Sequence, residues 1–159
     1  MQNKATGYYK SPLGTIRIEQ SDKGITSLVF QEKPKRVTRD DLFFQDVFFQ
    51  LDEYFAGKRK TFDLPLDLQG SEFQLSVWKV LLGIPFGKTK SYKEIAKKLK
   101  NPKLIRAVGK ANAKNPVSII VPCHRVIGSN GSLTGYAGGL WRKKWLLEHE
   151  EKYKQLSLF

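Results

Sequence analysis

Three short segments in the first half of the chain are rich in β-branched and aromatic residues. They span residues 8–10, 15–19 and 25–30. The stretches between them, Ser11-Pro12-Leu13-Gly14 and Ser21-Asp22-Lys23-Gly24, are typical turn sequences. Apolar runs joined by tight turns predict a meander of antiparallel strands.

A helix is predicted after this meander. Asp40-Asp41 would cap its N-terminus, Gly57 would end it, and residues 62–70 would form an extended connector. The apolar positions that recur at helical spacing, and that we expect in the core, are Leu42, Phe43, Val47, Leu51, Tyr54 and Phe55.

The second half of the chain predicts mainly helices. Ser71 precedes an amphipathic segment that ends near residues 83–87, and Ser91 precedes a second helix over residues 92–99. Asn101-Pro102 begins a third, over residues 103–113. Two short helices joined by a turn are typical of a helix-turn-helix, whose second helix lies against DNA. That helix carries small residues, which suit either a close approach to a groove or tight helix packing: Ala107, Gly109, Ala111 and Ala113.

The C-terminal part predicts one buried strand and one more helix. The strand is Ser118-Ile119-Ile120-Val121, which Pro122 would end. The helix begins after Gly138-Gly139, and its inward positions are expected to be Trp141, Trp145 and Leu146.

These elements predict an α+β protein with a small N-terminal domain and a mainly helical second domain. Residues 1–70 would form an antiparallel β-sheet with one helix. Residues 71–150 would form a helix-turn-helix-type domain, and residues 151–159 a flexible C-terminal tail. No apolar run approaches the roughly 20 residues that a membrane span needs.

Positive charge is confined to the second half. Residues 71–159 hold 17 Lys and Arg against 5 Asp and Glu, whereas residues 1–70 hold 11 against 10. Residues 86–115 alone carry ten basic residues and a single acid, Glu94. Such clustering favours a surface that follows phosphates over a generally solvated basic face.

Cys123 is the one cysteine in the chain, so neither an internal disulfide nor a cysteine metal cluster can form. The thiol is therefore either a buried filler or a nucleophile. It lies at the predicted strand end beside His124, a base that could remove its proton. One free thiol also suits a reducing compartment, so we expect a cytoplasmic protein.

Residues 115–127, Asn-Pro-Val-Ser-Ile-Ile-Val-Pro-Cys-His-Arg-Val-Ile, resemble the active-site signature of the O6-alkylguanine-DNA alkyltransferases. This family is also called the methylated-DNA–protein-cysteine methyltransferases. The resemblance continues through residues 73–78, 86–92, 106–109 and 135–150, with order and spacing kept. Residues 1–70 match only loosely.

The resemblance implies a reaction and the residues that perform it. The alkyl group on O6 of guanine, or on O4 of thymine, would move irreversibly to Cys123, which is then spent. His124 would be the base, acting through an ordered water. Glu150 would hold its far nitrogen, and Asn115 would brace the turn that carries the cysteine.

The resemblance also implies residues that bind DNA and the flipped base. Double-stranded DNA would be bound in its minor groove, with Arg106 filling the space that the base leaves and Tyr92 crowding the target phosphate. Other contacts to the DNA backbone and base pocket would come from Lys93, Asn101, Ser129, Val126, Tyr136 and Ala137. Several relatives have a small hydroxyl residue where this chain has Ala137.

No cofactor and no metal are expected. Some relatives hold a zinc ion in the first domain, but the two histidines here are His124 and His149 and the cysteine is the nucleophile, so that site is excluded. We expect a monomer.

Three other interpretations come from different classes. A sensor of DNA damage that performs no chemistry would have another residue in place of the cysteine, so the presence of Cys123 argues against this interpretation. A helix-turn-helix regulator would favour long polar side chains for reading bases over the small residues at 107, 109 and 111. A cysteine hydrolase would need an oxyanion hole, which the sequence neither indicates nor excludes.

The last five residues resemble the pentapeptide with which bacterial repair proteins bind the sliding clamp. They are Gln155, Leu156, Ser157, Leu158 and Phe159. A glutamine followed by leucine and phenylalanine anchors suits a pocket in such a partner, although a frayed end folded back on the core is the competing interpretation.

Overall fold

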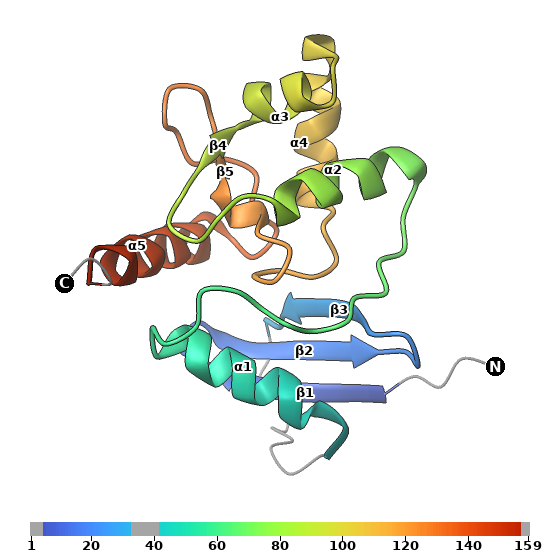
Figure 1. Ribbon diagram of the computed structural model, residues 1–159, viewed down its shortest axis with the longest axis vertical. Helices are drawn as coiled ribbons and strands as arrows, with labels where there is room; N and C mark the ends of the chain where they lie inside the picture. Colours follow the sequence, from blue (N-terminus) through green and yellow to red (C-terminus); the bar gives the residue numbers. More distant parts are fainter. Residues whose placement is uncertain (1–4, 33–41, 157–159) are drawn as a thin grey trace. The chain divides into compact units, whose positions relative to one another are not determined.

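The computed structural model describes residues 5–32 and 42–156 (Figure 1). The described residues up to Gln69 form one compact unit, and those from Gly70 onward form a second. The predicted Asp40-Asp41 cap lies outside the described residues.

The N-terminal unit contains the predicted meander. Strands β1 (Ala5–Ser11), β2 (Gly14–Gln20) and β3 (Ile25–Phe30) pair antiparallel in the order β1-β2-β3. In the first turn, Ser11 Oγ donates to Gly14 O, and Gly14 adopts a φ of 111°. A glycine therefore allows the chain to reverse within two residues.

One helix covers this sheet. A short 3-10 turn, η1 (Leu42–Phe44), leads into α1 (Gln45–Phe55), and Tyr9 Oη of β1 donates to Asp52 of α1 over 2.6 Å. The prediction of an apolar stripe was correct in register but wrong at its start, because Leu42 and Phe43 are exposed. The buried positions of η1 and α1 that pack in the core are Phe44, Val47, Phe48, Leu51 and Tyr54.

The C-terminal unit is mainly helical, as predicted. Its elements are α2 (Glu72–Leu82), β4 (Lys90–Ser91), α3 (Tyr92–Lys98), η2 (Pro102–Leu104), α4 (Ile105–Ala113), η3 (Cys123–Arg125), β5 (Val126–Ile127) and α5 (Leu140–Leu156). The two short strands pair in parallel, so the segment after the cysteine is joined to the start of α3.

The serines that were predicted to precede the helices do cap them. Ser71 and Ser91 each accept a hydrogen bond from the third residue of the helix, and that residue's side chain bonds back. These reciprocal capping boxes satisfy backbone donors that a helix N-terminus leaves unpaired. Asn101 caps η2 in a similar way. Of the small residues on α4, Ala111 is buried and its carbonyl accepts from Trp78 of α2, so this helix packs tightly against α2.

The strand predicted at Ser118–Val121 was wrong. This segment is a buried turn, and Ile119 has a φ of 71°, which side chains with a branched Cβ rarely adopt. The Asn115 side chain replaces the missing strand partner. Its amide donates to the carbonyls of Val117 and Val121 and accepts from the Val117 N–H. Buried apolar residues thus need no sheet here, because a side chain pairs the backbone groups.

Helix α5 departs from the prediction at both ends. Trp141 is 58% exposed, so the buried face begins after it, with Arg142, Lys143 and Leu146. The helix also continues to Leu156, so residues 151–156 are not part of a flexible tail. Rings at helical spacing contact one another along its last turns: Trp145 stacks on His149, and Tyr153 lies tilted against His149.

Replacing Asn115 by alanine should strongly destabilise the C-terminal unit. The Val117 N–H would lose its partner, and the carbonyls of Val117 and Val121 would each lose one of two hydrogen bonds, for a total of about 2–4 kcal/mol. Urea unfolding followed by tryptophan fluorescence measures this unit, since Trp78, Trp141 and Trp145 all lie in it.

Asn130→Ala is the matched control. The side-chain oxygen of Asn130 also accepts a hydrogen bond from the N–H two residues on, that of Ser132, but it does so in an exposed loop. It should cost less than about 1 kcal/mol. Equal losses for both variants would contradict the bracing role of Asn115.

Candidate active site

Cys123 is the first residue of η3 and lies at the end of the buried turn. The residue is 4% exposed. Burial raises the pKa of its thiol to about 11, although a bond from Asn115 and the charge of Lys143 both act to lower it. The resting sulfur is therefore a protonated thiol, and a base is needed to make it a nucleophile.

His124 and Glu150 form the next layer of the site. Their side chains are buried, and His124 Nε2 lies 2.8 Å from Glu150 Oε2. An ionised carboxylate can only accept a hydrogen bond, so Nε2 of His124 carries the hydrogen and Nδ1 keeps its lone pair. Nδ1 is buried and has no hydrogen-bond partner among the described residues. Burial lowers the pKa of His124, which keeps the ring neutral and Nδ1 able to accept a proton.

Glu150 also binds the arginine of the signature. Arg125 donates from Nε to Glu150 Oε1 over 2.8 Å and from Nη2 to Oε2 over 3.0 Å. Burial acts to raise the pKa of Glu150, but the charges and bonds of His124 and Arg125 bring it well below its usual value. This carboxyl group is consequently ionised at any physiological pH.

Lys143 is a buried residue that the sequence analysis did not single out. Its ammonium donates to Val126 O over 2.6 Å and to Thr134 O over 2.7 Å. Burial lowers its pKa to about 8, against the raising effect of Cys123. In the sequence analysis it was not distinguished from its basic neighbours in the run 142–144. The available signal was its spacing from Leu146 and Glu150, which places all three on one helix face.

The predicted walls of the base pocket lie around the same loop. Tyr92, at the start of α3, donates from its hydroxyl to Thr134 O, the carbonyl that Lys143 also binds. Val126 and Tyr136 are buried, and burial raises the pKa of Tyr136. Ala137 is exposed. The loop over residues 134–137 is thus tied both to α3 and to α5.

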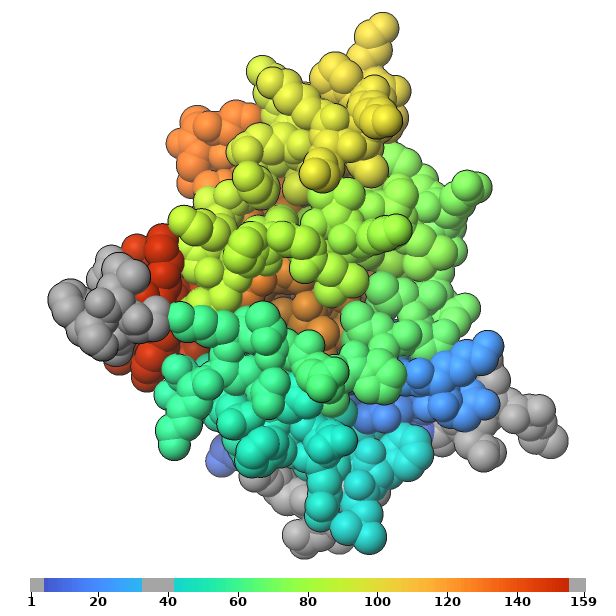
Figure 2. Space-filling view, in the orientation of Figure 1, coloured from blue at the N-terminus to red at the C-terminus, as the bar shows by residue number. Residues whose placement is uncertain are grey.

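The predicted DNA contacts lie at the surface of this unit. Lys93 on α3, Asn101 before η2, Arg106 on α4 and Ser129 after β5 are all exposed. Every lysine and arginine from 88 to 114 is exposed as well (yellow-green to yellow in Figure 2). The basic residues of this segment thus all reach solvent, as the predicted phosphate-binding surface requires.

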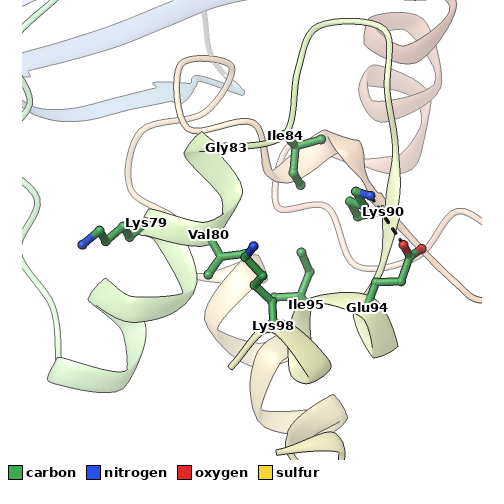
Figure 3. A pocket seen from close by; sticks show the side chains of 8 residues that line it. All are labelled: Lys79, Val80, Gly83, Ile84, Lys90, Glu94, Ile95 and Lys98. Carbon is green, nitrogen blue, oxygen red and sulfur yellow. Dashed lines mark ion pairs between the residues drawn. The ribbon is translucent and has the colours of Figure 1, made fainter. Parts of the chain in front are cut away.

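Another cavity is lined by residues of α2, the turn that follows it, β4 and α3. Its volume is about 450 Å³, and Ile84 and Ile95 point toward each other inside it (Figure 3). Lys79, Lys90 and Lys98 also line it, and Lys90 pairs with Glu94. None of the predicted site residues lines this cavity, so it is distinct from the Cys123 site.

Comparison with known proteins identifies the family. Residues 72–152 match the model of the DNA-binding domain of 6-O-methylguanine DNA methyltransferase, and residues 5–68 match that of its ribonuclease-like domain. Together these matches span most of the chain, which therefore belongs to the 6-O-methylguanine DNA methyltransferase family.

Individual relatives agree with this assignment. The methylated-DNA–protein-cysteine methyltransferase of Methanosarcina mazei is 53% identical over 148 residues, covering 89% of this chain and 94% of the relative. The crystal structure of the Mycobacterium tuberculosis O6-methylguanine methyltransferase has a TM-score of 0.86 at 44% identity and covers 95% of this chain and 94% of that one. A complex of the M. tuberculosis protein with DNA gives a TM-score of 0.84 at 46% identity, covering 92% of each chain. The predicted α+β fold is confirmed.

Proposed function

We propose that this chain repairs DNA by moving an alkyl group from O6 of guanine onto Cys123, once per molecule. Support comes from its family and from relatives named methylated-DNA–protein-cysteine methyltransferase. The observation that carries the residue assignment is the burial of Cys123 and His124 as neighbours in η3, with His124 bonded to the buried Glu150.

The reaction divides into proton removal and alkyl transfer. His124 Nδ1 receives the thiol proton through an ordered water, and Glu150 stabilises the imidazolium that results. The sulfur then attacks the alkyl carbon, the bond from that carbon to O6 breaks, and the electron pair stays on guanine, which takes up a proton. A thioether remains on Cys123. It is a poor leaving group, so the protein is consumed.

O6 of guanine is hidden in the base stack, so the nucleotide must rotate out of the duplex. Unstacking costs a few kcal/mol, which a side chain that fills the vacated space offsets. We assign this role to Arg106 and assign crowding of the target phosphate to Tyr92. Binding in the minor groove, with backbone contacts from Lys93, Asn101 and Ser129, would suit a search that ignores sequence.

Several finer assignments belong to the same proposal. Activity on O4-methylthymine, a monomeric state and a cytoplasmic location all fit the reaction, which needs a reduced thiol. Among the described residues, no helix has the length and apolar character to cross a membrane.

Transfer can be tested directly with duplex DNA that carries O6-methylguanine. Wild-type protein should gain the mass of one methyl group on Cys123, in stoichiometric yield. Cys123→Ser should gain none yet keep its affinity for DNA, because an alcohol without a strong base is a far weaker nucleophile. Intact-mass and peptide mass spectrometry give both results, and a methyl adduct on another residue would refute the assignment.

Arg106→Ala separates flipping from chemistry. Transfer from duplex DNA should slow by about ten- to a hundredfold, whereas reaction with free O6-benzylguanine, which needs no flipping, should change less than about twofold. Lys110→Ala, another exposed basic residue of α4, is the control and should affect both substrates little. Equal losses on the two substrates for Arg106→Ala would mean that Arg106 is structural.

Recruitment to a sliding clamp through residues 155–159 is the remaining partner proposal. Ser157, Leu158 and Phe159 lie outside the described residues, whereas the backbone of Gln155 and Leu156 ends α5. Docking as an extended peptide would therefore require the last turn of α5 to open. Titration of a labelled full-length chain with purified bacterial clamp should saturate at micromolar concentration, as five residues allow. Leu158→Ala/Phe159→Ala should abolish that binding, and no saturation would exclude the partner.

A further inference from the structure

The signature arginine, Arg125, has no part in the chemistry described so far, although it is 6% exposed and makes three charged hydrogen bonds. Two of them form a fork on Glu150, one to each carboxylate oxygen. The third runs from Nη1 to Ile84 O over 2.6 Å, and the guanidinium lies over the Phe86 ring. Arg125 therefore fixes the orientation of Glu150 from a rigid position of its own.

The balance of charge around Glu150 gives this arrangement a chemical consequence. A buried carboxylate requires a nearby cation, because an unpaired charge in the interior is very costly. Two neighbouring side chains can supply the cation: Arg125, which is always protonated, and His124, which is protonated only if its ring takes up a second proton. Because Arg125 already supplies the charge, His124 can pair with Glu150 through one N–H and stay neutral.

We propose, on the basis of the function given above, that Arg125 is the permanent counter-ion of Glu150 and thereby keeps His124 neutral and able to accept the proton of Cys123. Arg125 is thus a positioning residue for alkyl transfer, acting through Glu150 on His124. The fork occupies one lone pair of each carboxylate oxygen, and the second lone pair of Oε2 accepts from the His124 N–H.

Other groups near the pair are consistent with this role. His124 is influenced by Glu150 and Lys143 of α5 and by Arg125 beside it, and burial together with the two cations lowers its pKa, while Glu150 raises it. Lys143 contributes charge but directs its hydrogen bonds to Val126 O and Thr134 O. From the loop before β4, the Gly87 N–H also approaches Glu150 Oε1, at 3.4 Å. It carries no charge, so it cannot replace Arg125.

The test is the pH profile of single-turnover transfer from free O6-benzylguanine, which avoids effects on DNA binding. Arg125→Gln removes the cation, so the pKa of His124 should rise as the ring becomes the counter-ion of Glu150. The neutral base then exists only above this higher pKa. The acid limb of the profile should move up by at least about one pH unit, and the rate at pH 7 should fall by about tenfold or more.

Two further variants separate charge from geometry. Arg125→Lys keeps the cation but not the fork, so its acid limb should stay near that of wild type while the rate on the plateau falls. Arg142→Gln removes another buried arginine, one that donates to Gly138 O and lies over Trp141, and should leave the acid limb in place. A merely structural role for Arg125 would lower stability in its variants without moving the limb of Arg125→Gln.

Nitrogen-15 NMR of the histidine rings gives a readout that needs no substrate. The chain has two histidines, and His149→Gln assigns their signals. At pH 7 the wild-type His124 should show one protonated and one unprotonated nitrogen, and Arg125→Gln should show two protonated nitrogens. If Arg125→Gln does not fold, Arg125→Lys still decides, because its His124 must remain neutral.

The outcomes distinguish this inference from the proposed function. Suppose that wild-type protein transfers the alkyl group, but Arg125→Gln keeps an unchanged acid limb and a neutral His124. That result overturns the counter-ion role of Arg125 and leaves the proposed function intact. Wild-type protein that transfers nothing refutes the proposed function, and the NMR result then still confirms or overturns the counter-ion role. A protonated His124 in wild type or in Arg125→Lys also overturns it.

Discussion

The carboxylate of Glu150 is almost completely removed from solvent, and the elements around Cys123 are arranged to compensate for it. His124 and Arg125 reach it from η3, and the loop before β4 contributes the Gly87 N–H. A buried ion pair seldom adds much stability over apolar packing, but removal of one partner is strongly destabilising because the other charge stays buried and unpaired. Glu150 therefore ties α5, η3 and this loop into one arrangement, in which the cysteine segment has little freedom to shift.

The pattern of apolar residues was enough to predict most of the fold, because strands and helices here follow their usual periods and begin at recognisable caps. It failed where a side chain replaced a regular backbone partner. Residues 118–121 have the composition of a buried strand, yet Asn115 bonds to Val117 and Val121 on either side of a turn, and the turn's own backbone groups bond to one another. It failed also at the ends of helices, where Trp141 and Phe43 are exposed although their spacing suits burial.

The site was predictable to the extent that its chemistry lies in the signature. His124 bonds to Glu150 in the structure, but the resemblance and not the apolar pattern predicted Glu150, because Glu148 and Glu151 beside it are acids as well. Lys143 was missed because a lysine within a basic run normally faces water. Its burial depends on two carbonyls, Val126 O and Thr134 O, from segments distant in sequence, and the sequence alone does not reveal such partners.

Burial has a further effect on a protein that can react only once. A thiolate reacts with oxidants and other electrophiles as well as with its substrate, whereas a neutral thiol is far less reactive. The pKa of Cys123, about 11 because of burial, holds nearly all of the sulfur as thiol at rest. Nδ1 of His124 has no partner among the described residues, and the charge of Lys143 acts to lower the pKa of the thiol. In the proposed reaction, activation requires a proton to move from the sulfur toward His124, and it can coincide with arrival of the alkyl group.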